Sequence, residues 1–245
     1  MLNDFTILLS ASNSPPMPGL LSCFRHNGER NIRLAGIDMS SDPSAKYMVD
    51  SFYQVPVASD PNYCDIVLDI CGKEKVDIYF PTISAEVEAV TKRRQDFADI
   101  GTIISAADAE AVTIANNKLR MYEMLEKNGV PGPAFYGVHS KEDFAEGCRR
   151  LGYPNKAVCL KIVDGSGSRG VRIIDANRNR YQIFVSEKPN SFFTSYEDML
   201  SILARRRIST SRCRWNICPA MSTRWTCWQT TVRCFMRWAE ITSSA

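Results

Sequence analysis

The segment KIVDGSGSRGVRI, from Lys161 to Ile173, has the composition of a loop that can hold a phosphate. Its glycines let the backbone approach a ligand closely and turn N–H groups towards anionic oxygens, while serine hydroxyls add further donors. Lys161 lies just before the loop, where an ammonium group could neutralise phosphate charge. The candidate site therefore consists of Lys161 and the loop residues Gly165, Ser166, Gly167, Ser168, Arg169 and Gly170.

Two interpretations of this segment stay open on the residues alone. It can bind phosphate, and it can equally be an ordinary flexible hairpin that follows an exposed lysine. The segment is not a Walker A loop, since no G-K-[ST] sequence closes it. It is also not the GxGxxG turn that opens a helix.

A second candidate is Lys118, in the sequence Asn116-Asn117-Lys118. We expect it inside a helix spanning about 108–128, where a lysine is ordinarily a solvated surface charge. Its interest is its position, because it lies where the first part of the chain passes into the second. Clefts between domains are favoured ligand sites.

The elements that would position these residues begin with alternating strands and helices. We expect strands at 5–11, 31–39, 51–57, 76–82 and 102–105, and helices at 19–27, 60–71 (capped by Asp60), 84–97 (capped by Ser84) and 108–128. This alternation indicates right-handed βαβ crossovers and a mainly parallel sheet. Asp38, Glu86 and Glu88 follow strand ends, where such sheets present ligand-binding groups, but they are equally typical of solvated helix-start charges.

The organisation changes after the sequence VPGP at 130–133. We expect a strand at 135–138, a helix at 141–151 capped by Ser140, and two antiparallel strands at 156–163 and 171–175 around the glycine loop. An extended segment at 181–186 and a helix at 196–203 capped by Ser195 follow. The second part is therefore predicted to be α+β.

The composition changes again near residue 204. Residues 204–245 contain eight arginines, no lysine, one acid (Glu240), all four tryptophans and four of the nine cysteines. Their net charge is +7, so the remaining residues carry −4 of the overall +3. The excess of basic over acidic residues lies in this segment alone, so it does not indicate an acidic partner for the whole chain.

The spacing of the cysteines and the length of the apolar runs indicate where in the cell the protein is located. Cys23, Cys64, Cys71, Cys148 and Cys159 show no CxxC spacing, which is typical of buried thiols in a reducing environment. No apolar run approaches the roughly 20 residues of a membrane span, and the N-terminus lacks the basic region of a signal peptide. We therefore expect a cytoplasmic location, no membrane partner and no metal site made by cysteines.

Taken together, the motifs resemble the ATP-grasp superfamily, and within it the carbamoyl-phosphate-synthase-like carboxylate–amine ligases. The resemblance covers about residues 5–203. It depends on the strand ends GIDM and IYFPT and on the stretches NNKLRMYEMLEKNGVPGPAFY and RRLGYPNKAVCLKIVDGSGSRGVRII. The order and spacing of these pieces are more specific than the glycine loop alone.

The resemblance implies a fold, a reaction and ligands. The fold would be a Rossmann-like, parallel-sheet pre-ATP-grasp domain at 1–110, followed by the N-terminal part of an α+β ATP-grasp domain at 111–203. By motif match, Lys118 and Lys161 would contact ATP phosphates, and 165–170 would fold over them. Such enzymes use ATP and Mg²⁺ to convert a small carboxylate into an acylphosphate that an amine or ammonia attacks.

The chain departs from this family pattern in two places. The first βα turn, SASNSPPMPG, has few glycines, so we assign no nucleotide to the N-terminal part. After Leu203 neither the adenine-binding hinge nor the magnesium ligands of the family follow. We therefore expect an incomplete and weakly active or inactive ligase. The alternative is a non-catalytic nucleotide-binding or interaction module.

The segment 204–245 has the composition expected of a shifted reading frame. Permitted codons for RWNICPAM at 214–221, read from the third base of the first codon, give V-E-Y-L-P-G-D. We therefore expect a frameshift near 204–207. The alternative is a genuine basic, aromatic segment that binds nucleic acid by stacking and phosphate contacts.

Overall fold

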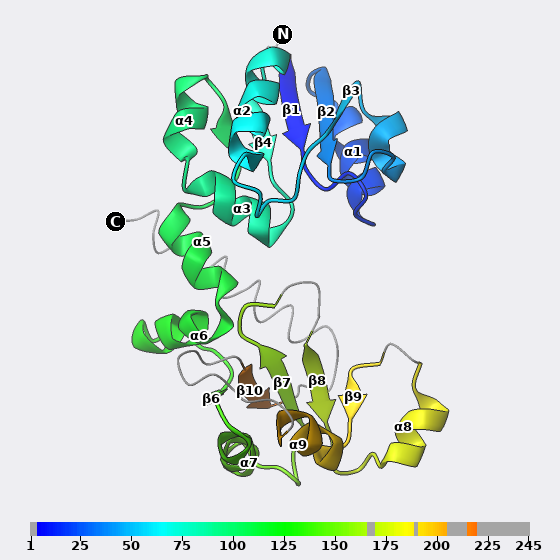
Figure 1. Cartoon of the computed structure of the whole chain (residues 1–245), viewed down its shortest axis with the longest axis vertical. Coiled ribbons are helices and arrows are strands. Elements are labelled where there is room, and N and C mark those ends of the chain that lie inside the picture. Colours follow the sequence, from blue (N-terminus) through cyan, green and yellow to red (C-terminus); the bar gives the residue numbers. More distant parts are fainter. Residues whose placement is uncertain (1–3, 166–169, 189–190, 205–214, 220–245) are drawn as a thin grey trace. The chain divides into compact units, whose positions relative to one another are not determined.

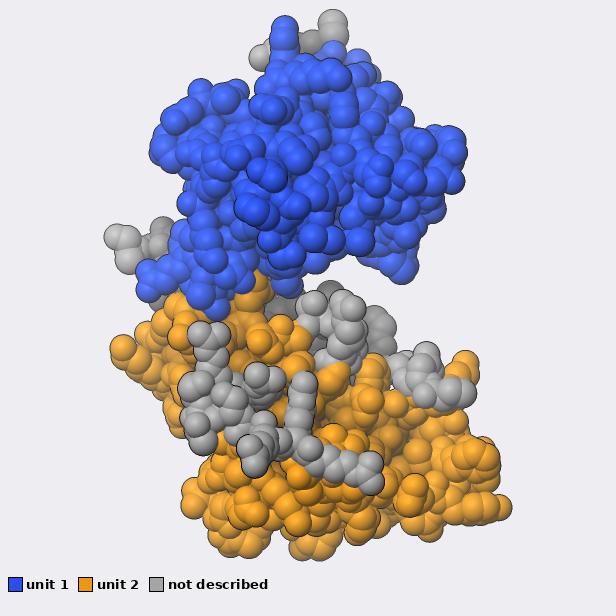
Figure 2. All heavy atoms as spheres, in the orientation of Figure 1, with its two compact units in different colours: residues 1–113 blue, residues 114–245 orange. Residues whose placement is uncertain are grey.

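The computed structural model describes residues 4–165, 170–188, 191–204 and 215–219. The chain divides into two compact units, residues 1–113 and residues 114–245, which are coloured separately in Figure 2. Ser166, Gly167, Ser168 and Arg169 of the predicted site lie outside the described residues. Each unit is described by itself.

Unit 1 contains a parallel sheet of five strands in the order β3-β2-β1-β4-β5 (Figure 1). The strands are β1 (Phe5–Leu9), β2 (Ile32–Asp38), β3 (Ser51–Gln54), β4 (Ile78–Phe80) and β5 (Ile103–Ile104). Leu8 of β1 pairs with Ala35 of β2 on one side and with Tyr79 of β4 on the other. The predicted parallel α/β architecture is confirmed.

Helices cover both faces of this sheet. They are α1 (Met17–Arg25), the 3₁₀ helix η1 (Ser44–Met48), α2 (Tyr63–Glu74), α3 (Ser84–Thr91) and α4 (Arg94–Asp99), with α5 (Ala109–Asn116) at the end of the unit. Leu8 packs with Val67 of α2 and Phe97 of α4 on one face. Leu9 packs with Leu21 of α1 on the other. Burial of both faces explains why the strands read as nearly continuous apolar runs.

Two predicted helices of unit 1 have different bounds in the structure. The helix expected from Asp60 begins at Tyr63, because the Asp60 carboxylate accepts the N–H of Asn62 at 2.8 Å and closes a turn there. The helix expected at 84–97 is two helices, α3 and α4. They are separated at Arg93, whose guanidinium pairs with Asp65 and Asp96 instead of continuing a helical surface. Ser84 is the first residue of α3, and the N-cap position expected for it is occupied by Ile83.

Unit 2 contains a mixed sheet in the order β6-β10-β7-β8-β9. The strands are β6 (Tyr136–Val138), β7 (Val158–Ile162), β8 (Val171–Ile174), β9 (Phe193–Thr194) and β10 (Trp215–Pro219), with helices α6 (Lys118–Lys127), α7 (Lys141–Arg150), α8 (Arg180–Ser186) and α9 (Tyr196–Ala204). The strands β7 and β8 are antiparallel around the glycine loop, as predicted. Ser140 caps α7 in a capping box with Asp143, and the Ser195 hydroxyl accepts the N–H of Asp198 at 3.1 Å.

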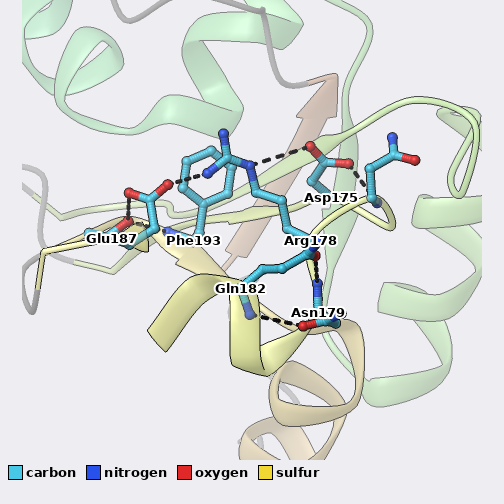
Figure 3. A network of polar contacts seen from close by, with 8 residues as sticks. Asp175, Arg178, Asn179, Gln182, Glu187 and Phe193 are labelled. Atoms are coloured by element: carbon cyan, nitrogen blue, oxygen red, sulfur yellow. Dashed lines mark hydrogen bonds and ion pairs between the residues drawn. The ribbon is translucent and has the colours of Figure 1, made fainter. Parts of the chain in front are cut away.

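The segment predicted to be extended at 181–186 is a helix instead. Asn179 and Gln182 form a capping box, which is a strong signal for the start of a helix. Figure 3 shows how the surrounding chain folds back on itself. The Arg178 guanidinium lies 4.0 Å from the ring centroid of Phe193, pairs with Glu187, and has its Nε 3.9 Å from Asp175 Oδ2. These contacts join the turn before α8 to the edge strand β9.

The strand β10 comes from the segment expected to fall outside the family fold, yet it lies between β6 and β7 (Figure 1). Ile217 points into a core that contains Leu160 of β7 and Phe144 of α7. Met199 and Leu203 of α9 close the same core. The packing of unit 2 therefore includes residues beyond 204.

Glu86 is the most deeply buried acid of α3 and is only 8% exposed. Burial raises the pKa of its carboxyl group, although hydrogen bonds from Ser10, the Ile83 backbone and Tyr63 favour the charged form. Its Oε2 atom has no hydrogen-bond partner in the described part of the chain. Glu88, by contrast, is a solvated charge that pairs with Lys92 at 2.8 Å.

Asp38, at the end of β2, has a structural role that accounts for its burial. Its two carboxylate oxygens accept the backbone N–H groups of Asn13 and Ser40, each at 2.8 Å. The side chain therefore connects the loop after β1 to the loop after β2.

Replacing Gly147 with alanine should destabilise unit 2. A Cβ at this position of α7 would lie 2.9 Å from Ile217 Cγ2 and 2.9 Å from Tyr136 Cδ1. Overpacking of this kind costs about 1–3 kcal/mol, which exceeds the gain of about 1 kcal/mol in helix propensity. Urea denaturation measures the effect. Gly72→Ala on α2 is the control, because its Cβ would meet nothing within 4 Å. A Gly147→Ala protein as stable as the wild type would contradict the packing of α7 against β10.

Replacing Glu86 with glutamine should flatten the pH dependence of stability. Because the pKa of Glu86 is higher in the folded chain than in the unfolded chain, the folded state binds the proton more tightly. The free energy of unfolding therefore falls as pH rises through the window between the two pKa values. Urea titrations at pH 4.5 and pH 8 should show a larger loss for the wild type than for Glu86→Gln. Glu88→Gln should behave like the wild type, and equal pH dependence in all three proteins would refute the assignment.

Candidate functional site

Lys118 begins a helix, whereas the sequence predicted it inside one. Asn117 adopts an extended conformation (φ −105°, ψ 101°) that ends α5 and starts α6. Its side-chain oxygen accepts the N–H of Arg120 at 3.0 Å, which is the ordinary role of asparagine as an N-cap. The break also frees the backbone N–H of Lys118, which donates to the carbonyl of Val163 at 3.0 Å. This bond connects the start of α6 to the end of β7.

The Lys118 ammonium group lies against the start of the glycine loop. It is half-buried and donates a hydrogen bond to the carbonyl of Gly165. Burial lowers the pKa of Lys118, and the positive charge of Lys161 lowers it further, whereas Asp164 raises it. The structure therefore brings Lys118 close to Lys161 and Gly165, which lie more than forty positions later in the sequence.

The glycine at the other end of the loop is required by the backbone. Gly170 has a φ of +68°, and a Cβ there would lie 2.9 Å from Ile162 Cγ2. Its carbonyl accepts the N–H of Ile162 at 3.2 Å. The start of the loop is thus bonded to Lys118 of α6 and its end to Ile162 of β7, while 166–169 lie outside the described residues.

The sheet of unit 2 presents two different faces. Residues of β7 alternate, so Val158 and Leu160 point into the apolar core, and Cys159 and Lys161 point to the other face. On β10, Asn216 is directly opposite Lys161 and Cys218 directly opposite Cys159. The second face therefore collects the polar and thiol side chains of these two strands.

Asn216 is a member of this face that the sequence analysis did not identify. It is 1% exposed, and neither polar atom of its amide has a hydrogen-bond partner among the described residues. A buried amide without partners is costly, because its desolvation is not compensated. The alternation in WNICP is typical of a strand with Asn216 on the opposite face from Trp215 and Ile217, but no local signal places that strand beside Lys161.

The chemistry of this arrangement is that of an anion site. Two ammonium groups close together repel each other, and a polyphosphate between them would remove that repulsion while accepting hydrogen bonds. Among the residues that the structure describes, no three His, Cys, Asp or Glu side chains gather as metal ligands. No helix in the described ranges is long and apolar enough to cross a membrane.

The other cysteines of the described residues are mostly buried, as predicted. Cys64, Cys71 and Cys148 lie in the interior, and burial raises the pKa of each thiol, to about 12 for Cys71 and Cys148. Cys23 is exposed, contrary to the prediction, because it lies on the outer side of α1, whose buried residues are Met17 and Leu21. None of these thiols lies near the two lysines in sequence.

Comparison with known proteins gives one family model and several relatives. The model for the PylC-like N-terminal domain matches residues 18–124. The formate-dependent phosphoribosylglycinamide formyltransferase of Ignicoccus hospitalis is 33% identical over 92 residues, which are 37% of this chain and 22% of that protein. The carbamoyl phosphate synthase large chain of Beutenbergia cavernae is 24% identical over 187 residues, 72% of this chain and 17% of that protein.

Solved structures share the fold at low sequence identity. N5-carboxyaminoimidazole synthetase from Staphylococcus aureus, complexed with ADP, has a TM-score of 0.57 and 13% identity, with 91% of this chain and 49% of that chain covered. The biotin carboxylase domain of Hydrogenobacter thermophilus 2-oxoglutarate carboxylase, in complex with MgADP, ADP and bicarbonate, has a TM-score of 0.55 and 17% identity, with 90% and 45% covered.

The chain spans about a fifth of the length of the curated relatives that it matches. The matches cover the parallel α/β domain and extend into the unit that carries Lys118, Lys161 and the glycine loop. They agree with the fold expected from the sequence motifs. The chain is therefore similar to ATP-grasp carboxylate–amine ligases, in sequence over part of its length and in fold.

Proposed function

We propose that unit 2 binds the phosphates of ATP between Lys118, Lys161 and the glycine loop. The observation that carries this proposal is the position of the Lys118 ammonium group. It contacts the loop at Gly165, and the positive charge of Lys161 lowers its pKa. The remaining proposed contacts are the N–H and hydroxyl groups of Ser166 and Ser168, the backbone of Gly167 and Gly170, and the side chain of Arg169.

The lowered pKa of Lys118 supports the same proposal. Its cause is burial together with a second positive charge, and both of these penalise the ammonium form in the absence of an anion. An ATP phosphate would offset the repulsion between Lys118 and Lys161. The site therefore has a reason to prefer a polyanion over a neutral ligand.

The proposed ancestral reaction is ATP-dependent ligation of a small carboxylate to an amine or ammonia. Phosphorylation makes the carboxylate reactive, because phosphate is a good leaving group and carboxylate oxygen is a poor one. Lys118 and Lys161 would hold the phosphates and offset their charge as phosphoryl transfer proceeds. Mg²⁺, where bound, would supply additional charge neutralisation.

We further propose that this chain is a weakly active or inactive form of such a ligase. The candidate site contains the two cations Lys118 and Lys161, and the described residues include no cluster of carboxylates that could hold Mg²⁺. Without the metal, most of the stabilisation of transferring phosphoryl charge is missing. A non-catalytic nucleotide-binding module is the second candidate, and the same observation favours it.

The segment 204–245 is proposed to be a displaced reading frame, with the chain before it forming a pre-ATP-grasp domain at 1–110 and part of an ATP-grasp domain at 111–203. Two observations support this. The segment has eight arginines and no lysine. In addition, the shifted reading places a glutamate at the position of Asn216, opposite Lys161, where the present amide is buried without hydrogen-bond partners among the described residues. An opposite-charge pair across two strands would be more favourable than an unpaired amide.

Sequencing the gene tests the frame proposal. A single intact frame that continues through a longer ligase-like gene would support it. A stop codon after Ala245, with a homogeneous protein of that length, would refute it.

Removing either lysine should weaken ATP binding. Lys118→Ala and Lys161→Ala should each raise the Kd for ATP about tenfold to a hundredfold, because a hydrogen bond to a charged group contributes about 1.5–3 kcal/mol. Calorimetric titration with and without Mg²⁺ measures this. Lys127→Ala is the matched control, since Lys127 is exposed on the same helix α6. Unchanged affinity in both variants would exclude the phosphate site. Weak binding that is independent of Mg²⁺ would favour the non-catalytic module.

The 245-residue chain should release negligible phosphate from ATP in the presence of Mg²⁺ and candidate carboxylates. The physical reason is the missing charge stabilisation at the transferring phosphoryl group. A colorimetric phosphate assay over hours is sufficient. Turnover of about 1 per second or faster, which is typical of enzymes, would contradict the proposal.

A further inference from the structure

Cys159 and Cys218 form a cross-strand pair in the sheet of unit 2. Cys159 is on β7 and Cys218 is on β10, and the two residues are directly opposite each other in antiparallel register. Their side chains point to the face that also carries Lys161. Cys159 is 8% exposed and Cys218 is 4% exposed.

The register satisfies the geometric requirement for a disulfide. Opposed residues of antiparallel strands have Cα atoms about 4.5–5.5 Å apart, and disulfides join Cα atoms about 4.4–6.8 Å apart. The Sγ atom of Cys218 lies 3.7 Å from the carbonyl oxygen of Cys159. The two thiols also interact with each other directly. The register therefore places the two residues within the Cα separation that a disulfide spans.

The other described cysteines do not share this geometry. Cys64 and Cys71 are seven positions apart on helix α2, and Cys148 is on helix α7. Burial raises the pKa of all three thiols. Cys218 differs, because its hydrogen bond with Cys159 and the charge of Lys161 lower its pKa to about 7 in spite of burial. A thiol with a lowered pKa supplies more of the nucleophilic thiolate at neutral pH.

We propose that Cys159 and Cys218 are a redox-active pair that closes to a cross-strand disulfide by exchange with a small-molecule disulfide. The Cys218 thiolate attacks one sulfur of the reagent and releases one reagent thiolate. The Cys159 thiol then loses its proton, attacks the Cys218 sulfur of the mixed disulfide and releases the second reagent thiolate. Two protein thiols are thereby oxidised, and one reagent disulfide is reduced to two thiols, which take up the two protons.

The disulfide would fix the strand that carries Lys161 to its neighbour. Cys159 is two residues before Lys161 on β7, and the link would hold β7 and β10 in their present register. Since both sulfurs are buried, the reagent reaches them only when the strands separate locally, so the exchange rate would report that opening. This inference concerns the 245-residue chain itself. It does not depend on the proposed ATP site, and it applies to the present reading of 215–219, because the shifted reading V-E-Y-L-P-G-D contains no cysteine.

Tryptic mapping of the native protein tests the proposal. The protein is incubated with oxidised glutathione at pH 7.5, quenched with acid and alkylated, and digested without reductant. Trypsin releases Cys159 in peptide 157–161 and Cys218 in peptide 215–224, so the disulfide should join these two short peptides. The intact protein should lose the mass of two hydrogens. Recovery of the two peptides separately, each alkylated or carrying glutathione, would overturn the proposal.

Three controls test whether the cross-link is specific to these two cysteines and to the folded chain. Cys148→Ala removes another buried thiol of unit 2 and should leave the cross-link intact. Cys159→Ala should leave only a glutathione adduct on Cys218. The same incubation in 8 M urea should give a mixture of pairings, and a 159–218 link that forms only in urea would also overturn the proposal.

Discussion

The attachment of the start of α6 to the end of β7 is the constraint on which the candidate site depends. The backbone N–H of Lys118 donates to Val163, and its ammonium group donates to Gly165. Each bond joins residues more than forty positions apart, so the first turn of a helix is held beside a loop from the sheet. Without this attachment, the repulsion between Lys118 and Lys161 would separate the two side chains. The fold therefore holds the charges of Lys118 and Lys161 close to each other, with the carboxylate of Asp164 nearby.

The two faces of the sheet of unit 2 differ in the kind of side chain that they carry. The apolar face packs on α7 and α9 and accounts for the burial of Leu160 and Ile217. The opposite face holds Lys161 and Asn216, and the buried amide of Asn216 is energetically costly because no described residue bonds to it. Buried amides in sheets usually have hydrogen-bond partners. The amide of Asn216, which has none among the described residues, lies on the same face as Lys161. The strand β7 thus contributes Leu160 to the core and Lys161 to the opposite face.

Local signals in the sequence account for most of the fold. Alternating strands and helices predicted the parallel sheet, and the glycine loop between two apolar runs predicted the β7–β8 hairpin. The errors have local causes as well: Asn117 interrupts a helix that apolar periodicity alone would continue, and the Asn179 cap starts a helix in a β-branched, aromatic segment. The position of β10 could not be predicted, because which strand enters the middle of a sheet depends on non-local pairing. The approach of Lys118 to Gly165 required tertiary structure for the same reason.

The two edge strands of the second sheet have a consequence for self-association. The edges are β6 and β9, which contain three and two residues. Edges this short offer few unsatisfied backbone groups to another chain, which limits aggregation by strand addition. The helix beside β9 has Tyr181 and Phe184 at 74% and 84% exposure. At high protein concentration, clustering of unit 2 would therefore involve aromatic side chains of a helix and not the backbone of the sheet.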